Sequence, residues 1–486
     1  MRRLKLRIIS ILMAAFCIFT LFACNDDSKE SDGKDKNPQI SKDSRDIRLP
    51  YSQEDSLNPY VAKSLMNRSI IPLVYDSLYV VDGFYQAQPS VAQSGTIMGL
   101  EVAVQLNTSK RFADGSYISA QDVVYSFSLA KQSVYYSQSL INITKAQEKG
   151  TQEVLFTLAT NDVYALACLD FPIVKSGTAI DGTDAVPIAS GRYSLEDNEG
   201  IKCLCVNKSY AGYSPLSSKI ELVNITDSKA IIHSLVIGNI DSLFCDLGGG
   251  SYERINAGTQ EVVLNNFVFL GINKYSAKLS DPVLRQSISA LLDREKIINE
   301  GFQGYASAAY TPFSPKWYAL KSITQPGKEL DSSNAALYIA KNAPKLNLKL
   351  VVNSDNEFKK LAAQTIVQIF QSAGVAVTVT ELPWESFNAA VASNNYDIYL
   401  GEIKLTNNMN LYPLFKTDDL SYAYYTQMLQ GTITVQNFID NFYNELPFIP
   451  IGYRRGVLAF SRHIAVEVKS CENDLYQNIG EWYLKD

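Results

Sequence analysis

Residues 346–401, LNLKLVVNSDNEFKKLAAQTIVQIFQSAGVAVTVTELPWESFNAAVASNNYDIYLG, carry the clearest structural signal in this chain. Short runs rich in β-branched residues alternate there with stretches of helical spacing, in the order 346–352, 357–372, 375–382, 385–392 and 396–401. Strands that alternate with helices along a chain are typical of a parallel α/β layer with right-handed connections. The stretch therefore predicts a strand–helix–strand–helix–strand unit.

The predicted elements outside this unit are shorter and more often strands. Alternating hydrophobic residues predict strands at 47–51, 100–106, 154–158, 191–195, 202–207, 220–225, 240–244, 262–264 and 267–272. Helical spacing predicts helices at 66–78, 119–130, 228–237 and 282–292, and Pro282 suits the first turn of the last one. No internal repeat is visible, so the two halves of the chain differ in character.

Length and composition limit the class of protein. A chain of 486 residues exceeds what one hydrophobic core usually organises, so at least two lobes are expected. A hydrophobic fraction of 46% and a mean hydropathy of -0.06 exclude a disordered chain and a polytopic membrane protein. The net charge of -6 argues against a nucleic-acid binder that relies on phosphate neutralisation.

The N-terminus has the pattern of a bacterial lipoprotein signal. Residues 1–7 carry four positive charges, residues 8–22 are almost entirely apolar, and Ala23 precedes Cys24. We expect residues 1–23 to be a signal peptide, Cys24 to carry the lipid, and the polar stretch 24–45 to be a disordered tether. The protein would then be held at the outer face of the cytoplasmic membrane or in the periplasm. An uncleaved anchor with an incidental cysteine is the alternative interpretation.

The sequence lacks the short motifs of common enzyme classes. It contains no GxSxG, GxxxxGK[ST], GxGxxG or HExxH pattern, and Gly248-Gly-Gly250 is interpreted as a flexible connection. The two histidines, His233 and His463, lie far apart. We therefore predict no enzymatic activity, no cofactor and no metal site, although an acidic pair suited to glycoside hydrolysis is not excluded by sequence.

Five cysteines follow Cys24, and their number and spacing do not suggest a disulfide framework. Cys203 and Cys205 are two positions apart on a predicted strand, so both thiols should point to one face. We interpret all five as small, mostly buried hydrophobic side chains.

A series of short motifs resembles one family. In chain order they are SLNP at 56–59, VYDSL at 74–78, KRFADG at 110–115, SAQDVVYS at 119–126, PIASGRY at 187–193, GNID at 238–241, FLGIN at 269–273, DPVLRQSI at 281–288 and LPFIPI at 446–451. Each motif is weak alone, but their order behind a lipoprotein signal resembles the extracytoplasmic solute-binding proteins of ABC transporters, in the oligopeptide, dipeptide and nickel group (family 5). The resemblance covers residues 47–486.

This resemblance implies an α/β, two-lobed, periplasmic-binding-protein-like clamp of the class II or cluster C type. Lobe I would span 46–270 with an extra subdomain at about 80–175, lobe II would span 271–446, and residues 447–486 would return to lobe I. Two crossing strands would join the lobes, and a ligand bridging them would favour the closed state. Several motif residues are predicted to be architectural: Gly115 and Gly191 in tight turns, Asp122 at a helix cap, and Arg285 in an ion pair or on a solvated face.

The resemblance also implies a place for the ligand. In relatives, the loop after the strand that corresponds to 396–402 lines the cleft, and peptide-binding relatives carry an aspartate there for the ligand's ammonium group. Here the loop offers Lys404, Asn407, Asn408, Met409 and Asn410 and no acid. Dipeptide-binding members use an arginine for the ligand carboxylate, but the matching stretch 353–357 has none.

Three further residues complete the predicted site. Trp384 is a candidate stacking wall, with a core-packing role as the equal alternative, and Ser52 and Gln53 are candidates to face the cleft from lobe I. The two missing charges weaken the assignment to short zwitterionic peptides. Longer peptides held by main-chain hydrogen bonds, or another polar solute, stay open, whereas the scarcity of histidine argues against nickel.

The resulting functional hypothesis is a membrane-tethered, monomeric binding protein that delivers a peptide or similar polar solute to the permease subunits of an ABC importer. The first alternative is a lipoprotein that senses peptides or pheromones without transport. The second, weaker alternative is an extracytoplasmic hydrolase on the same lipoprotein platform.

Overall fold

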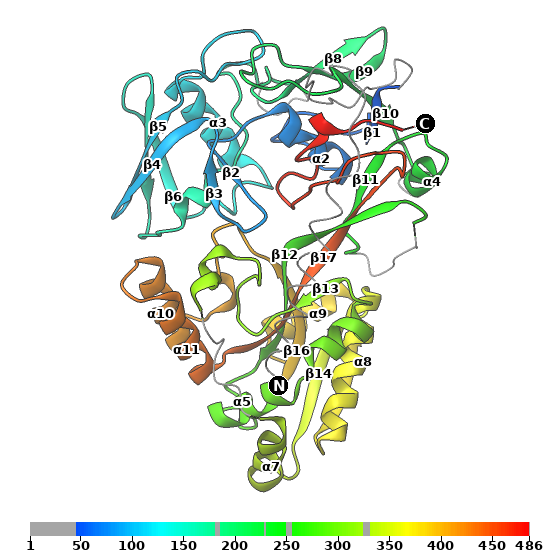
Figure 1. The fold of residues 1–486 in the computed structure, drawn as a ribbon. Helices are drawn as coiled ribbons and strands as arrows, with labels where there is room; N and C mark the ends of the chain where they lie inside the picture. Colours follow the sequence, from blue (N-terminus) through cyan, green and yellow to red (C-terminus); the bar gives the residue numbers. More distant parts are fainter. Residues whose placement is uncertain (1–44, 180–184, 228–229, 249–254, 324–330, 486) are drawn as a thin grey trace, which may run out of the picture. The chain divides into compact units, whose positions relative to one another are not determined.

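The computed structural model describes residues 45–179, 185–227, 230–248, 255–323 and 331–485 (Figure 1). Cys24 and the predicted signal and tether segments lie outside these residues. Within the described residues the strands form one seven-stranded sheet, two four-stranded sheets and one two-stranded sheet.

The seven-stranded sheet contains the unit that the sequence predicts at 346–401. Its strand order is β11 (Ser242–Cys245), β17 (Phe448–Phe460), β12 (Gly258–Ile272), β16 (Ile398–Lys404), β14 (Asn347–Asn353) and β15 (Ala376–Leu382), with β13 (Ala306–Ala308) paired to β17. β14 pairs in parallel with both β15 and β16, which confirms the predicted parallel layer. The sheet as a whole is mixed, because β12 and β17 join it as antiparallel strands.

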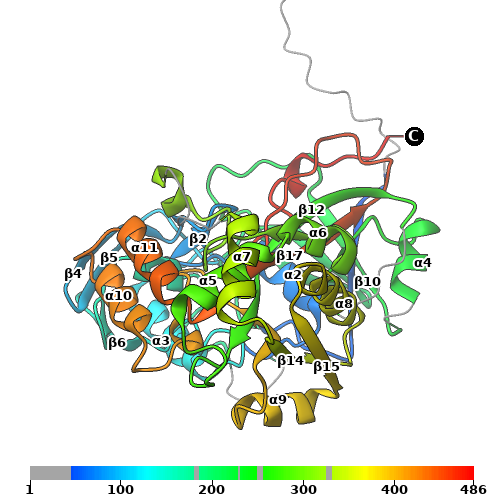
Figure 2. The same ribbon diagram turned by 90° about the horizontal axis from the view of Figure 1, so that it is seen from below.

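The central strand β14 is largely buried, because apolar side chains cover both of its faces. Leu348, Leu350 and Val352 belong to the same core cluster as the apolar side of α8 (Glu357–Ser372). Val351 points to the other face and packs in a cluster with Phe387 of α9 (Trp384–Ala392). Figure 2 shows α8 and α9 beside β14 and β15. Alternate residues of one strand thus meet two different helices, as expected for a parallel strand.

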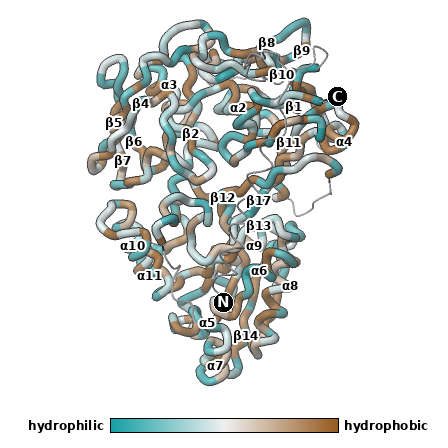
Figure 3. Tube along the Cα trace, in the orientation of Figure 1, coloured by the Kyte–Doolittle hydropathy of each residue, from teal (hydrophilic) through white to brown (hydrophobic). Residues whose placement is uncertain are grey.

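Two long strands run through both of the large hydrophobic cores. The first core is built mainly from residues 47–222 and 464–482, and it includes Val262 and Leu264 of β12 and Leu458 of β17. The second core is built mainly from residues 267–453, including the other ends of β12 and β17. The hydrophobic residues of these strands are brown in Figure 3. The predicted lobe boundaries and the subdomain limits stay predictions.

The sequence predicts two separate strands at 262–264 and 267–272, and this prediction is wrong. β12 is one strand of 15 residues. Its pairing with β17 is irregular between the pairs Val263–Arg455 and Phe267–Tyr453, so the ladder is interrupted by a bulge. The polar residues Asn265 and Asn266 fall in that bulge, which is why the hydrophobic pattern breaks there.

The N-terminal sheets carry most of the remaining predicted strands. One sheet has the order β1 (Ile47–Tyr51), β10 (Lys219–Asn224), β9 (Ile201–Val206) and β8 (Tyr193–Asn198). The other has the order β4 (Ala92–Met98), β5 (Glu101–Leu106), β7 (Glu153–Leu158) and β6 (Ile143–Glu148), and the small pair is β2 (Tyr79–Val81) and β3 (Ala87–Pro89). Strand predictions at 47–51, 100–106 and 154–158 are confirmed to within one residue.

Helix starts follow their capping residues closely. α3 (Ala120–Gln132) begins at a capping box in which Ser119 accepts from the N–H of Asp122 and the Asp122 carboxylate accepts from the N–H of Ser119. This confirms the predicted cap. The other helices of more than one turn are α2 (Leu65–Val74), α4 (Ile231–Val236), α5 (Pro282–Leu291), α7 (Ser332–Asn342), α10 (Leu420–Leu429) and α11 (Val435–Glu445).

Two motif residues have different roles from those predicted. Arg285 is 3% exposed, and its guanidinium donates to the main-chain carbonyls of Leu279, Ser280, Glu445 and Leu446. The predicted ion pair or solvated face is therefore wrong, because main-chain carbonyls just before α5 and at the end of α11 take its donors. Gly191 serves close approach rather than a tight turn, whereas Gly115, with φ of +85°, confirms the predicted turn.

Replacing Gly191 by Ala is expected to lower the free energy of unfolding by about 1–3 kcal/mol, as for other overpacked sites. A Cβ at this position would lie 2.6 Å from the main-chain carbon of Val74, and the N–H of Gly191 donates to the Val74 carbonyl at 2.8 Å. Urea unfolding measures the effect. Gly83→Ala is the matched control, because its Cβ would meet Cys471 at an ordinary 3.5 Å. Equal stability of the two variants would contradict the prediction.

All five cysteines after Cys24 are free thiols. Cys168, Cys203 and Cys471 are buried, and the other two are half-buried. The Sγ atoms of Cys203 and Cys205 lie 3.5 Å apart, which confirms that they share a strand face. Burial raises the pKa of Cys205 to about 12, so its thiol stays protonated.

Candidate functional site

The candidate site is a cavity of about 620 Å³, within the size range of ligand pockets. Its walls come from segments that are far apart in the sequence. They are the second half of α2 and the residues that follow it, the segment 134–139, Asp170 and Pro172, Arg192, Tyr210, residues 404–407 at the end of β16, and residues 472–474. The wall is thus mixed in polarity, with aromatic rings beside charged groups.

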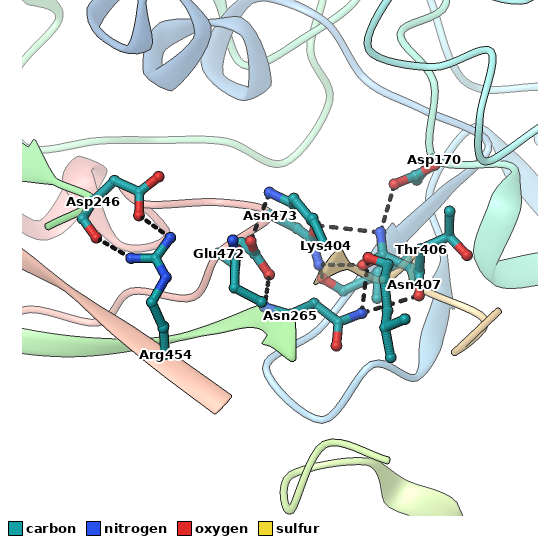
Figure 4. A network of polar contacts seen from close by, with 12 residues as sticks. Asp170, Asp246, Asn265, Lys404, Thr406, Asn407, Arg454, Glu472 and Asn473 are labelled. Carbon is teal, nitrogen blue, oxygen red and sulfur yellow. Dashed lines mark hydrogen bonds and ion pairs between the residues drawn. The ribbon is translucent and has the colours of Figure 1, made fainter. Parts of the chain in front are cut away.

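Asn265 fixes the part of the wall that follows β16. This residue is 1% exposed, and its side-chain amide donates to the carbonyls of Leu405 and Thr406 at 3.1 and 3.0 Å. Its carbonyl accepts from the N–H of Leu405, and its own N–H donates to Glu472 (Figure 4). The bulge in β12 frees these groups from the ladder with β17, so they can hold the 404–407 segment in place.

Asn407 and Asp170 meet across the cavity wall. The Asn407 side-chain amide donates to an Asp170 carboxylate oxygen at 2.7 Å and to Asn473 at 3.3 Å (Figure 4). Burial raises the pKa of Asp170 to about 6, although the hydrogen bond from Asn407 and the charge of Lys404 oppose the rise. With a pKa of about 6, the Asp170 carboxyl group is mostly ionised at pH 7 and takes up a proton as the pH falls through about 6.

Three ion pairs hold most of the other charged side chains around the cavity: Lys404–Glu472 at 2.7 Å, Arg192–Asp474 at 2.8 Å and Lys110–Asp76 at 2.6 Å. Each pair joins residues distant in sequence. Because these charges are balanced within the protein, they shape the wall and do not require a ligand to neutralise them.

Of the eight predicted ligand-contacting residues, Lys404 and Asn407 line the cavity. Asn408 is 7% exposed and donates to Asp162 at 2.8 Å. Met409 is fully buried in the second core, with φ of 57°, and the Asn410 side chain accepts from the N–H of Tyr412. The loop therefore divides its side chains between the cavity and the core.

The other three predicted residues are not among those that line the cavity. The main chain of Ser52 exchanges hydrogen bonds with Asn67, and the N–H of Gln53 donates to Asn224. The Trp384 ring is 52% exposed and stacks on Phe387 with centroids 6.0 Å apart. Whether these residues contact a ligand stays a prediction.

Sequence reasoning missed several residues of the wall, chiefly Arg68, Tyr136 and Asp170. No local pattern marks them, since Arg68 lies within a helix and Asp170 within an irregular segment. The motif at 187–193 contained Arg192, which turns out to line the cavity beside Asp474. A contact between Asn407 and Asp170 joins positions 237 apart, which spacing alone does not reveal.

Replacing Asp170 by Asn is expected to raise the free energy of unfolding by about 1–3 kcal/mol at pH 8 and to change it little at pH 4. The folded-state pKa of about 6 exceeds the ordinary 3.8, so the folded protein holds this proton more tightly than the unfolded chain does. The wild type therefore loses stability as the pH rises from about 4 through 6, and Asn cannot ionise.

Urea unfolding between pH 4 and pH 8 measures this difference, with the exposed Asp440→Asn as a control that should show none. A difference that is the same at every pH would contradict the predicted pKa.

Two negative findings concern the described residues alone. No group of three or more His, Cys, Asp or Glu side chains there is arranged to hold a metal ion. No helix in the described part of the chain has the length and apolar character needed to cross a membrane.

Comparison with known proteins places this geometry in a family. The family of bacterial extracellular solute-binding proteins, family 5 (middle region), matches residues 86–418. The oligopeptide-binding protein AppA of Bacillus subtilis is 23% identical over 436 residues, which cover 82% of this chain and 79% of AppA.

Solved structures show the same fold at low sequence identity. AppA from Bacillus subtilis in complex with a nonapeptide has a TM-score of 0.59 at 19% identity and covers 91% of this chain and 99% of its own. The unliganded open form of the periplasmic murein tripeptide-binding protein MppA has a TM-score of 0.75 at 16% identity, with coverage of 92% and 98%. The predicted two-lobed α/β fold is confirmed by this likeness. Since the family match spans more than half of the chain, the chain belongs to the bacterial extracellular solute-binding proteins of family 5.

Proposed function

We propose that this protein captures a peptide, or a similar polar solute, in the cavity beside residues 404–407 and delivers it to an ABC importer outside the cytoplasm. The main observation in support is the cavity itself. It has the size of a ligand pocket, and it is lined by the loop that the family resemblance implies as part of the binding cleft. The oligopeptide-binding relative supports a peptide as the ligand.

We further propose binding without turnover. The ion pairs around the cavity engage the Lys404, Arg192 and Asp76 side chains, and this supports a recognition surface rather than a reacting centre. Lipid attachment at Cys24, the 24–45 tether, a monomeric state and contact with permease subunits belong to the same proposal. The lipoprotein pattern at the N-terminus supports the first two.

Native mass spectrometry of the gently purified protein tests the binding proposal, because it detects a retained ligand as added mass that denaturation releases. A defined pool of di- to nonapeptides is then added, and thermal unfolding is followed. Ligand at one hundred times its Kd should stabilise the protein by about 2.7 kcal/mol. No retained mass and no stabilisation by any pool would overturn the proposal, and cleavage of the peptides would favour a hydrolase.

A deletion strain distinguishes import from sensing. Loss of uptake of the bound peptide supports delivery to an importer, whereas unchanged uptake with an altered transcriptional response favours the sensing alternative.

A further inference from the structure

Two charged side chains at the cavity form no ion pair with any other residue that the structure describes. Once the pairs Lys404–Glu472, Arg192–Asp474 and Lys110–Asp76 are set aside, Arg68 and Asp170 are left among the charged residues that line it. They carry opposite charges and come from different segments. Both residues are half-buried, so a ligand group of opposite charge could reach each of them and form a charge-assisted hydrogen bond.

Asp170 has a hydrogen-bond donor but no cation. Its described side-chain partner is the neutral amide of Asn407, at 2.7 Å. The nearby ammonium group of Lys404 is held by Glu472 instead. An amide N–H donates to a carboxylate, but a charged ammonium group does so about twice as strongly. The Asn407 amide thus occupies the position that a ligand's ammonium group would fill more favourably.

Arg68 is a cation with no carboxylate partner in the described part of the chain. It lies on α2, and its guanidinium carbon is 3.7 Å from the centroid of the Tyr135 ring. Stacking on a ring face leaves the in-plane N–H groups available, and no hydrogen bond from them appears among the described contacts. These donors form the planar fork that suits a carboxylate.

Tyr136 lines the same cavity as the two charged residues. Burial raises the pKa of Tyr136, the charge of Asp170 raises it further, and the charge of Arg68 opposes the rise. Both charges therefore act on one phenol, which itself lines the cavity. Asp170, Arg68 and Tyr136 thus line the same cavity, and Tyr136 directly follows Tyr135, the ring on which Arg68 stacks.

We propose that Asp170 and Arg68 are the two charge anchors of a zwitterionic ligand, Asp170 for its ammonium group and Arg68 for its carboxylate. This assignment rests on the proposed function and deepens it, because it makes the ligand a short peptide with both ends free. On binding, the ammonium group displaces the Asn407 amide from Asp170. The absent acid in residues 404–410 and the absent arginine in residues 353–357 are thereby replaced from other elements of the fold.

The test uses the full chain and the tightest-binding free-ended peptide from the defined pool, in three forms: free at both ends, N-acetylated, and C-amidated. Affinity is measured by calorimetry for the wild type, Asp170→Asn and Arg68→Gln. The matched controls are Asp440→Asn and Arg462→Gln, which change exposed residues away from the cavity. Thermal unfolding of each variant checks that it is folded.

The expected pattern is a crossed one. Acetylation should weaken binding to the wild type about 10- to 100-fold, the range of a hydrogen bond to a charged group, and should have little further effect on Asp170→Asn. Amidation should do the same for the wild type and have little further effect on Arg68→Gln. Asp170→Asn should stay sensitive to amidation, and both control variants should behave as the wild type.

Three outcomes would overturn the assignment. If the wild type binds all three peptide forms equally, the anchors are wrong while the proposed function stands. If the folded variants keep wild-type sensitivity to the blocked ends, other residues hold the ends. If no peptide of any form binds, the assignment fails together with the peptide ligand, whereas a retained non-peptide mass in native mass spectrometry would leave capture of another polar solute standing.

Discussion

Replacing Glu402 by Gln is expected to lower the free energy of unfolding by about 3–5 kcal/mol, as when one partner of a buried ion pair is removed. Glu402 accepts from Arg454 at 2.6 Å and from Asn266 at 2.9 Å, and it lies 3.3 Å from the Lys359 ammonium nitrogen. Burial alone would raise the pKa of Glu402, but the charges of Lys359 and Arg454 outweigh it and lower the pKa. The neutral amide would leave two cations without their shared carboxylate.

The matched control is Glu261→Gln, which removes the partner of the adjacent Arg455. That pair is 2.7 Å long, but the Glu261 side chain is 56% exposed. An exposed pair contributes about 0–1 kcal/mol. Urea unfolding of both variants at pH 7 measures the contrast, and a loss for Glu402→Gln as small as that of the control would show that the network is not stabilising.

Arg285→Met should cost a similar amount, about 3–5 kcal/mol, since several buried acceptors lose their donors together. Methionine fills much of the same space but cannot donate, so the carbonyls of Glu445 and Leu446 at the end of α11 would be left unsatisfied. Those carbonyls also carry the negative end of the helix dipole, which a guanidinium balances. Leu446 has φ of 48°, a left-handed conformation that is costly for a residue other than glycine, and its carbonyl accepts from Arg285.

Calorimetric or urea unfolding of Arg285→Met tests this against Arg462→Met, which changes an exposed arginine. The control should lie within about 0.5 kcal/mol of the wild type. Arg285→Lys, which keeps the charge but loses the planar fork, should fall between the two. Full stability of Arg285→Met would show that water satisfies these carbonyls.

Local patterns predicted the elements of the fold well where hydrophobic periodicity was strong. The helix predicted at 357–372 has these bounds in α8, because Asn356 caps its start and the chain turns at Gly374 after its end. The prediction of two strands at 262–264 and 267–272 was wrong, because a bulge within one strand and a loop between two strands interrupt the hydrophobic pattern in the same way. Arg285 was misplaced because a sequence does not show which carbonyls surround an arginine.

The candidate site was predictable only in part. Lys404 and Asn407 came from a resemblance in motif order, and both line the cavity. Asp170 and Arg68 could not be found in this way, because their significance depends on which charges lack partners. That property emerges only after residues from distant segments have been brought together.

The bulge in β12 has a mechanical consequence. Three residues of β12, 264–266, lie opposite the single residue Arg454 of β17, so the regular pairing of the two strands is interrupted at this point. Asn265 lies in this bulge and donates hydrogen bonds both to Glu472 and to the main-chain carbonyls of residues 405 and 406. A change in the twist of the ribbon at this point would shift both attachments together, because both are bonded to Asn265. The irregular point of the ribbon is therefore linked directly, through Asn265, to the wall of the candidate cavity.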